Sequence, residues 1–198
     1  TASLDVTAVA NAVNVLQAEV ATAVPVVDNR ATVELAGTST IEAAGAVVLE
    51  SFTDTAVATT ADGTAGLGIV GTTVAFPTIT TRTQTRLVDA ASIANASSVS
   101  LRADAISDVD TVASATPAGA TLNPPTLATL ALATTAGTQD EAAAVASTQF
   151  SAATEAALDT SGAVVTSGGL TLLATGAHDV LTRADATPAV TPSSNGNA

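Results

Sequence analysis

The sequence predicts an all-β fold of stacked repeats. This prediction is supported by an internal repeat, by a period-two alternation of apolar residues and by a composition of small and β-branched side chains. Two segments align without a gap at one constant offset, which sets Pro25 on Pro77. Six further apolar pairs then coincide: Val27 on Ile79, Leu35 on Leu87, Ile41 on Ile93, Val47 on Val99, Leu49 on Leu101 and Val57 on Val109. Self-similarity of this kind marks units that bury their apolar faces against one another.

A third copy follows at a larger offset, which sets Ile93 on Val164. Thr148 takes the place of the proline, so this copy is the weakest match. The aligned apolar residues of this copy are Phe150, Leu158, Val164, Leu170, Leu172 and Val180. We therefore predict one domain over residues 1–186, with repeats at about 20–60, 72–112 and 143–183, and a linker or tail over residues 187–198.

Apolar and polar residues alternate within the repeats, as in Thr32 to Leu35 and Val99 to Arg102, which predicts short strands with one buried face. Candidate turns contain Gly37, Gly45, Gly119, Gly162 and Gly168-Gly169. No segment between the strands has the pattern of a long amphipathic crossover helix. Two architectures fit these observations: a parallel β-solenoid or an antiparallel β-sandwich.

Residues 4–21 fit two interpretations. Val6, Val9, Val13, Leu16 and Val20 are spaced like one face of a helix. Leu4, Val6 and Ala8 also alternate strictly, and valine favours strands. We favour a strand for this segment.

Composition excludes several classes of function. The chain has 5 Arg, no Lys and 18 acidic residues, for a net charge of −13. A surface this acidic repels phosphate backbones, so nucleic acid is not expected as a partner. The longest apolar run, Ala43 to Leu49, is far shorter than a membrane span. Because the chain begins at Thr1 without a methionine, we expect a mature or excised segment of something longer.

The segments Val26 to Val33 and Ile41 to Leu49, followed by an acidic, Thr-rich turn, resemble repeats of large secreted bacterial adhesins of the filamentous haemagglutinin type. The resemblance covers most of residues 20–185 and is one of rhythm and composition. It implies a right-handed parallel β-helix at the cell surface, and hence an extracellular location. Low Gly and Asn content in the turns and the longer spacing before the third copy depart from that family's pattern.

A solenoid with coils of about 20 to 25 residues would form eight or nine coils, stacked about 4.8 Å apart into a rod about 40 Å long. Open strand edges at both ends of such a rod have to be capped or paired. The expected partners are therefore further repeats of the same parent protein or other copies of the chain. The sequence does not identify a carbohydrate or other cell-surface ligand.

Asp104, Asp108 and Asp110 are the candidate metal ligands, because oxygen-rich turns of this kind hold calcium. Their spacing is not that of an EF-hand loop, and the alternative is a hydrated turn of mutually repelling charges. No other cofactor is expected.

The sequence predicts no catalytic or cofactor-binding residue. Residues 66–71 match the dinucleotide fingerprint, but they are not placed between a strand and a helix, as that fingerprint requires. His178 beside Asp179 has no accompanying nucleophile motif and is interpreted as a solvated turn residue. Glu34, Glu42 and Glu50 are interpreted as solvated residues of outer faces.

The predicted function is structural: an extracellular repeat segment that forms or extends a surface fibre or adhesin stalk, and not an enzyme. One alternative is a filament subunit that donates residues 4–24 to its neighbour. Another is a secreted polysaccharide-active β-helix enzyme, which the absence of Trp and Tyr disfavours.

The repeat also predicts which side chains are buried. Leu49, Leu101 and Leu172 should point inward, whereas Val48, Ser100 and Leu173 should point outward. The threonines between Thr78 and Thr83 suggest an outward ladder.

Overall fold

The computed structural model describes residues 1–11, 18–63, 70–115 and 141–186. Within these ranges the regular structure is entirely β-strand. The strands are β1 (Ala2–Asn11), β2 (Ala18–Ala23), β3 (Val26–Leu35), β4 (Thr40–Glu42), β5 (Ala46–Asp62), β6 (Val70–Ala75), β7 (Thr78–Asp89), β8 (Ser92–Ala96), β9 (Ser98–Ser114), β10 (Glu141–Ala146), β11 (Gln149–Thr160), β12 (Val164–Thr166) and β13 (Leu170–Asp185). The all-β prediction is confirmed.

The strands form four sheets. Sheet A has the order β1-β5-β9-β13, sheet B the order β10-β6-β2, sheet C the order β11-β7-β3, and sheet D the order β12-β8-β4. Every ladder between the described strands is parallel. The antiparallel sandwich is therefore wrong for this chain, because consecutive strands enter different sheets instead of turning back on one another.

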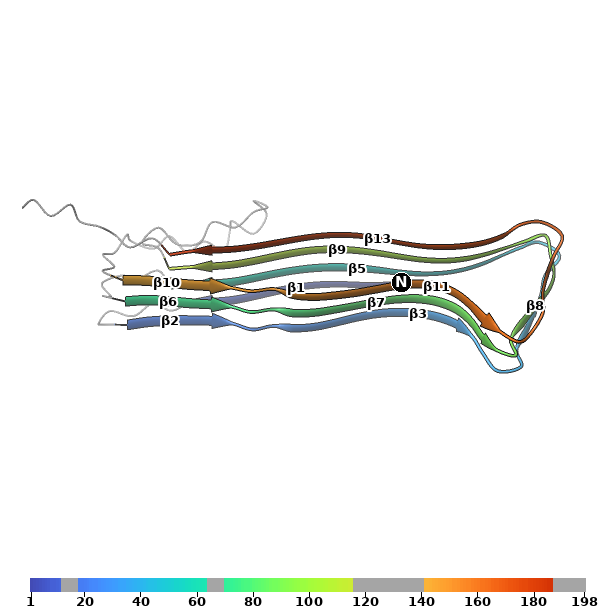
Figure 1. Cartoon of the computed structure of the whole chain (residues 1–198), viewed down its shortest axis with the longest axis horizontal. Helices are drawn as coiled ribbons and strands as arrows, with labels where there is room; N and C mark the ends of the chain where they lie inside the picture. Colours follow the sequence, from blue (N-terminus) through green and yellow to red (C-terminus); the bar gives the residue numbers. More distant parts are fainter. Residues whose placement is uncertain (12–17, 64–69, 116–140, 187–198) are drawn as a thin grey trace, which may run out of the picture.

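Each repeat visits the sheets in the same order. We call β2–β5 the first repeat, β6–β9 the middle repeat and β10–β13 the terminal repeat; each passes through sheets B, C, D and A in turn. Sheets B and C follow one another along one side of the molecule, sheet A runs along the other side in the opposite direction, and sheet D lies at one end (Figure 1). The cross-section is therefore long and flat.

Residues that pair between neighbouring strands are the same residues that the repeat alignment sets on one another. Val27 pairs with Ile79 and Leu49 with Leu101, as in the alignment of the first two copies, while Leu101 pairs with Leu172, as in the alignment of the third. Residues aligned in this way across the stack are called a column below. The expected rod of eight or nine short coils is wrong, because one passage through the sheets takes a whole repeat. Strands of 17 residues, β5 and β9, account for the longer passage.

The segment predicted as a strand over residues 4–21 is extended where it is described, in β1 and β2; residues 12–17 lie outside the described part. β1 pairs with β5, and β2 pairs with β6. Leu4 and Val6 of β1 pack against a buried apolar cluster, so period-two burial prevails over the helical spacing. The filament alternative, in which residues 4–24 are donated to a neighbour, stays a prediction.

Three apolar clusters occupy the interior between sheet A and the sheets that face it. One lies beside sheet D, one lies at mid-length and one consists of alanines toward the other end. Their buried members are, in that order, Val47, Leu87, Ile93, Ala96, Val99 and Leu101; Val27, Val57, Ile79 and Val109; and Ala21, Ala23, Ala61, Ala75 and Ala113. The repeat positions thus form the core, as the aligned columns predicted.

Buried hydroxyl groups fill the interior between the first two clusters. Ser51 Oγ lies 2.8 Å from Thr85 Oγ1, Thr53 Oγ1 bonds Thr83 Oγ1, and Asn29 Nδ2 donates to Thr55 Oγ1 at 2.8 Å. Such bonds satisfy polar groups that would otherwise destabilise a buried site. The narrow space between the sheets accommodates these small side chains without large rings.

The outward threonine ladder predicted on β7 is only half correct. Thr78 and Thr80 lie on the outer phase, but Thr81 and Thr83 are buried on the inner phase. The strand alternates strictly, and its β-branched hydroxyl residues fit both the solvated face and the narrow interior.

The three leucines predicted to point inward share one column, but only Leu101 is fully buried. Leu49 is half-buried, and Leu172 is 43 % exposed. Among the residues predicted to point outward, Val48 is 60 % exposed and Leu173 is 41 % exposed, whereas Ser100 is half-buried. The prediction that Leu172 is buried is wrong, because β13 has a neighbour on one side only.

The turn between sheets C and D requires a left-handed backbone. Gly37 in the first repeat has φ 68°, and Asp89 in the middle repeat has φ 60°. The Gly37 N–H donates to Asp89 Oδ2 at 3.1 Å, so stacked turns bond to each other. Most of the predicted turn glycines do lie outside strands; Gly119 is outside the described residues.

Candidate functional site

The outer surface of the terminal repeat is the first candidate site. All four of its strands lie at the ends of their sheets, on the same end of the stack. No other strand in the described part of the chain pairs with their free edges. A strand edge of this kind presents unpaired N–H and C=O groups to any further strand.

Side chains of the interior columns are exposed on this surface. Val180, in the column of the fully buried Val109, is 41 % exposed, and Leu158, in the column of the fully buried Leu87, is 37 % exposed. Exposed apolar side chains next to unpaired strand edges characterise a surface that binds another chain. We call the terminal repeat's exposed side the end face.

His178 lies on the end face. Contrary to the prediction of a turn residue, it is in the middle of β13, in the column of Thr55 and Ser107. Its ring faces Phe150, with the ring centroids 5.2 Å apart and an angle of 57° between the planes. Asp179 follows on the opposite phase of the same strand, so the two side chains point to different faces of the sheet. This arrangement does not orient an acid–base pair.

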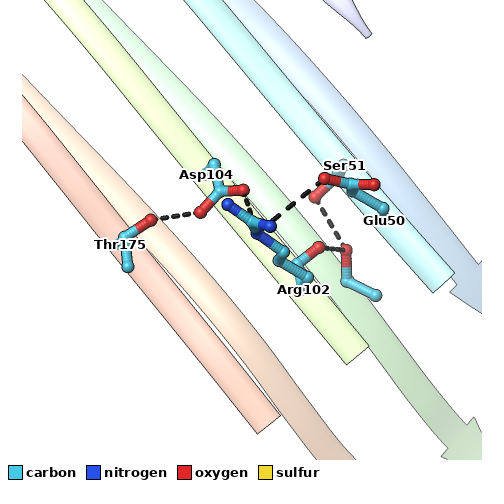
Figure 2. Close-up of polar contacts among 6 residues, drawn as sticks. Glu50, Ser51, Arg102, Asp104 and Thr175 are labelled. Atoms are coloured by element: carbon cyan, nitrogen blue, oxygen red, sulfur yellow. Dashed lines mark hydrogen bonds and ion pairs between the residues drawn. The ribbon is translucent and has the colours of Figure 1, made fainter. Parts of the chain in front are cut away.

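A charged network on the outer face of sheet A is the second candidate (Figure 2). Arg102 on β9 lies between Glu50 on β5 and Asp104 two residues along its own strand. Arg102 Nε is 3.8 Å from Glu50 Oε1, and it forms a closer ion pair with Asp104 Oδ2. Thr175 of β13 donates its hydroxyl to Asp104 Oδ1. Three adjacent strands are therefore joined by one network.

The predicted calcium ligands do not come together as one group. Asp104 is buried beneath Arg102 and Thr175, and four residues of extended chain, about 13 Å, separate it from Asp108. Asp108 and Asp110 share the outer face of β9, and Asp179 lies opposite Asp108 on β13. The described residues contain no group of three or more His, Cys, Asp or Glu with metal-site geometry. Calcium binding remains a prediction.

Carboxylates are crowded around Asp110. Burial raises the pKa of the Asp110 carboxyl, and the negative charges of Asp108 and Asp179 raise it further. No ion pair in the described ranges links these three residues to an arginine. Like charges on adjacent strands destabilise the sheet.

The glutamates that recur every eight residues lie on outer faces, as predicted. Glu34 is 2.9 Å from Arg86 Nη2, and Glu50 lies near Arg102. Glu42 is exposed. Surface ion pairs of this kind contribute about 1 kcal/mol or less to stability.

Two features of the site were not predicted from the sequence. The Arg102–Asp104 pair was missed, although two oppositely charged residues on the same phase of one strand could have signalled it. The end face was missed because the alignment gives columns without saying which strand is last in a sheet. Residues 66–69 of the fingerprint-like segment and the tail at 187–198 lie outside the described part.

Comparison with protein-family models, curated proteins and solved structures finds no match to the chain. A search of the described residues for a helix long and apolar enough to cross a membrane also finds none.

Proposed function

We propose that this chain is a length of right-handed parallel β-helix whose function is structural. Its repeats extend a fibre or adhesin stalk at the cell surface by stacking one repeat on the next. The observation that carries the proposal is the continuity of the columns: the apolar residues that build the middle repeat recur at the end face, where they are exposed.

The interior supports an extended structural role. Apolar columns repeat from one strand to the next, so the same apolar contacts serve a longer stack equally well. The resemblance to secreted adhesin repeats adds the extracellular location and the attachment function to the proposal. The net charge of −13 keeps such an assembly soluble and away from anionic surfaces.

A polysaccharide-active enzyme is the less favoured function. In the described residues, His178 and Asp179 point to opposite faces, and Arg102 is paired with carboxylates. Catalysis on a sugar acid requires a base and a charge-neutralising group placed together around the substrate.

Electron microscopy of the purified chain tests the proposed function. We expect elongated particles whose length increases with protein concentration, and no unsaturated product after incubation with polyuronates. Particles that stay the size of one chain at every concentration, or measurable turnover of a polyuronate, would contradict a structural role.

A further inference from the structure

We propose that the end face binds the end face of a second copy of this chain, with the two copies related by a twofold rotation about the long axis of the flat cross-section. The contact is head to head and involves only β10–β13 of each copy. A symmetric contact joins two copies and no more, so a longer fibre needs a further contact or further repeats elsewhere. This inference rests on the proposed structural function and names the partner of the end face and its orientation.

The rotation sets antiparallel strands on one another along the whole end face. Sheet A runs opposite to sheets B and C, and sheet D lies at one end (Figure 1). Turning a copy over about its long axis places its β13 on β10 and β11 of the other copy, and its β12 on the other copy's β12. Each pair is antiparallel, so the free edges can form the hydrogen bonds of an antiparallel ladder. Rotation about the short axis would instead move each sheet D away from the other.

The shape of the end face favours the same rotation. The chain rises by one strand with every passage through the four sheets, and sheet A is the last sheet that each repeat enters. β13 therefore stands further out than β10 and β11 (Figure 1). The rotation places the higher side of each copy on the lower side of the other, so both sides can pair at once. β1, the fourth strand of sheet A, lies at the far end of the stack and takes no part.

A contact across the interior fixes the register. Thr148 and Thr182 face each other inside one chain, and their hydroxyl oxygens are 2.7 Å apart. They therefore occupy the same position along the long axis. Because rotation about that axis preserves this position, Thr182 of one copy lies on Thr148 of the other. Counting along the antiparallel strands from this pair sets Val180 on Phe150, Leu172 on Leu158 and Ala184 on Ala146 of the second copy.

The residues brought together match in size and polarity, because each of these pairs joins two apolar residues or two threonines. Val180, Leu172 and Leu158 are 41 %, 43 % and 37 % exposed in the free chain, and docking would bury them as their columns are buried in the middle repeat. The 16 residues of β13 extend about 50 Å, and facing sheets lie about 10 Å apart. The contact thus covers about 500 Å² of each copy between the backbones alone, about 1,000 Å² in total, which reaches the size of a specific interface.

The outer side chains do not oppose this contact. Among the described residues, the register sets no carboxylate directly on another carboxylate. It sets Asp179 on Ser151, Glu155 on Thr175, Asp159 on Thr171 and Asp185 on Val145 of the second copy. Like charges directly opposite each other would have destabilised the ladder.

Val165 marks the twofold axis. It is the middle residue of β12, and it is 54 % exposed. Antiparallel pairing of β12 with the second copy's β12 places the two Val165 side chains opposite each other, where paired Cβ atoms are about 4.5 to 5.5 Å apart. A small adjustment of this distance allows a disulfide bond. Because the chain contains no cysteine, an introduced thiol is unique.

Disulfide crosslinking of single-cysteine variants of the full chain tests the proposal. Val165→Cys should form a covalent dimer under mild oxidation. Val26→Cys is the matched control, because Val26 is 78 % exposed but lies on β3, at the other end of the stack. Its thiols meet only by chance, so it should crosslink at least about ten times more slowly. Equal rates for the two variants would overturn the proposal.

A mixture of Leu172→Cys and Leu158→Cys tests the rotation. These two residues lie on each other across the contact, so the mixture should give a covalent heterodimer. Each variant alone should stay largely uncrosslinked, because its thiol meets a leucine of the second copy. If Leu172→Cys crosslinks to itself, or if the mixture gives no heterodimer, the proposed rotation is wrong.

Sedimentation velocity across a range of concentrations measures the affinity. Val180→Asn should raise the Kd of the dimer at least about 100-fold, because a buried amide enters the contact twice. Leu181→Asn lies next to it, is 44 % exposed in the free chain and faces outward, so its Kd should stay within about threefold. Equal effects would contradict the register. If the unmodified chain assembles but Val165→Cys does not crosslink, the docking geometry fails and the structural function stands; if the unmodified chain never assembles, both fail.

Discussion

The middle and terminal repeats carry similar side chains in the same columns, yet their burial differs completely. Leu101, Val109 and Leu87 of the middle repeat are 0 % exposed. Their partners in the terminal repeat, Leu172, Val180 and Leu158, are 43 %, 41 % and 37 % exposed. The difference shows that burial in a stacked sheet depends on a neighbour on each side, and not on the residue's column alone.

This difference assigns separate roles to the two repeats. The middle repeat provides stability, because its side chains exclude water on both sides. In the terminal repeat the same columns are exposed and no described strand pairs with the outer strand edges, and we propose that assembly takes place there. A variant at one column should therefore affect folding in the middle repeat and assembly in the terminal repeat.

The largest effect is expected from a charge placed in the shared leucine column. Leu101→Asp would bury an unpaired carboxylate and lower the free energy of unfolding by several kcal/mol. Leu172→Asp, in the same column of the terminal repeat, should lower it by less than about 1 kcal/mol, because water reaches the side chain. Urea denaturation monitored by circular dichroism measures both, and equal losses would contradict the comparison.

A smaller effect is expected from the buried hydroxyl groups. Thr83→Val removes the hydrogen-bond partner of Thr53 and should lower the free energy of unfolding by about 1 to 3 kcal/mol. Thr154→Val lies in the same column of the terminal repeat, where the side chain is half-buried, and should change it by about 0.5 kcal/mol or less.

The double variant Thr53→Val with Thr83→Val provides the control. With both hydroxyl groups removed, no unpaired polar atom remains from this pair, so part of the lost stability should return. A double variant as unstable as the sum of the two single variants would show that the hydroxyl groups act independently.

The smallest effect concerns the crowded carboxylates of sheet A. Because the pKa of Asp110 is raised in the folded chain, the folded state binds this proton more tightly than the unfolded state does. The contribution of Asp110 to the free energy of unfolding is therefore favourable at low pH, and it is lost as the pH rises through the pKa that Asp110 has in the folded chain. Asp110→Asn should raise the melting temperature slightly at pH 7, and the difference should shrink as the pH falls below 4.

A control at a paired carboxylate sharpens this prediction. A hydrogen bond from Arg30 lowers the pKa of Asp28, so the sign is opposite there. Asp28→Asn should not raise the melting temperature at pH 7. An equal rise in both variants would point to the reduced net charge and not to the local environment of Asp110.

The columns of this fold could be predicted from the sequence, because the offsets between the aligned copies are the registers of the ladders. The strand over residues 4–11 could also be predicted, because apolar and polar residues alternate there. The length of one coil could not be predicted, because Pro and Gly indicate turns but do not show that the 17 residues of β5 contain no turn.

The polar interior and the site were harder to predict. Thr81 and Thr83 suit a buried or a solvated face equally, so threonine alone does not decide which way a strand faces. The aspartates were grouped as one site because they are close in sequence, but an extended strand separates Asp104 from Asp108. Exposure of the end face depends on the number of strands in each sheet, which no local pattern encodes.

Hydrogen exchange of β13 at low and high protein concentration tests the central claim most directly, that the end face is an unfinished stack completed by another copy. We expect the β13 amides that point away from β9 to exchange rapidly at low concentration. At high concentration these amides should become protected like the amides of β9. Protection that is absent at high concentration would contradict the account.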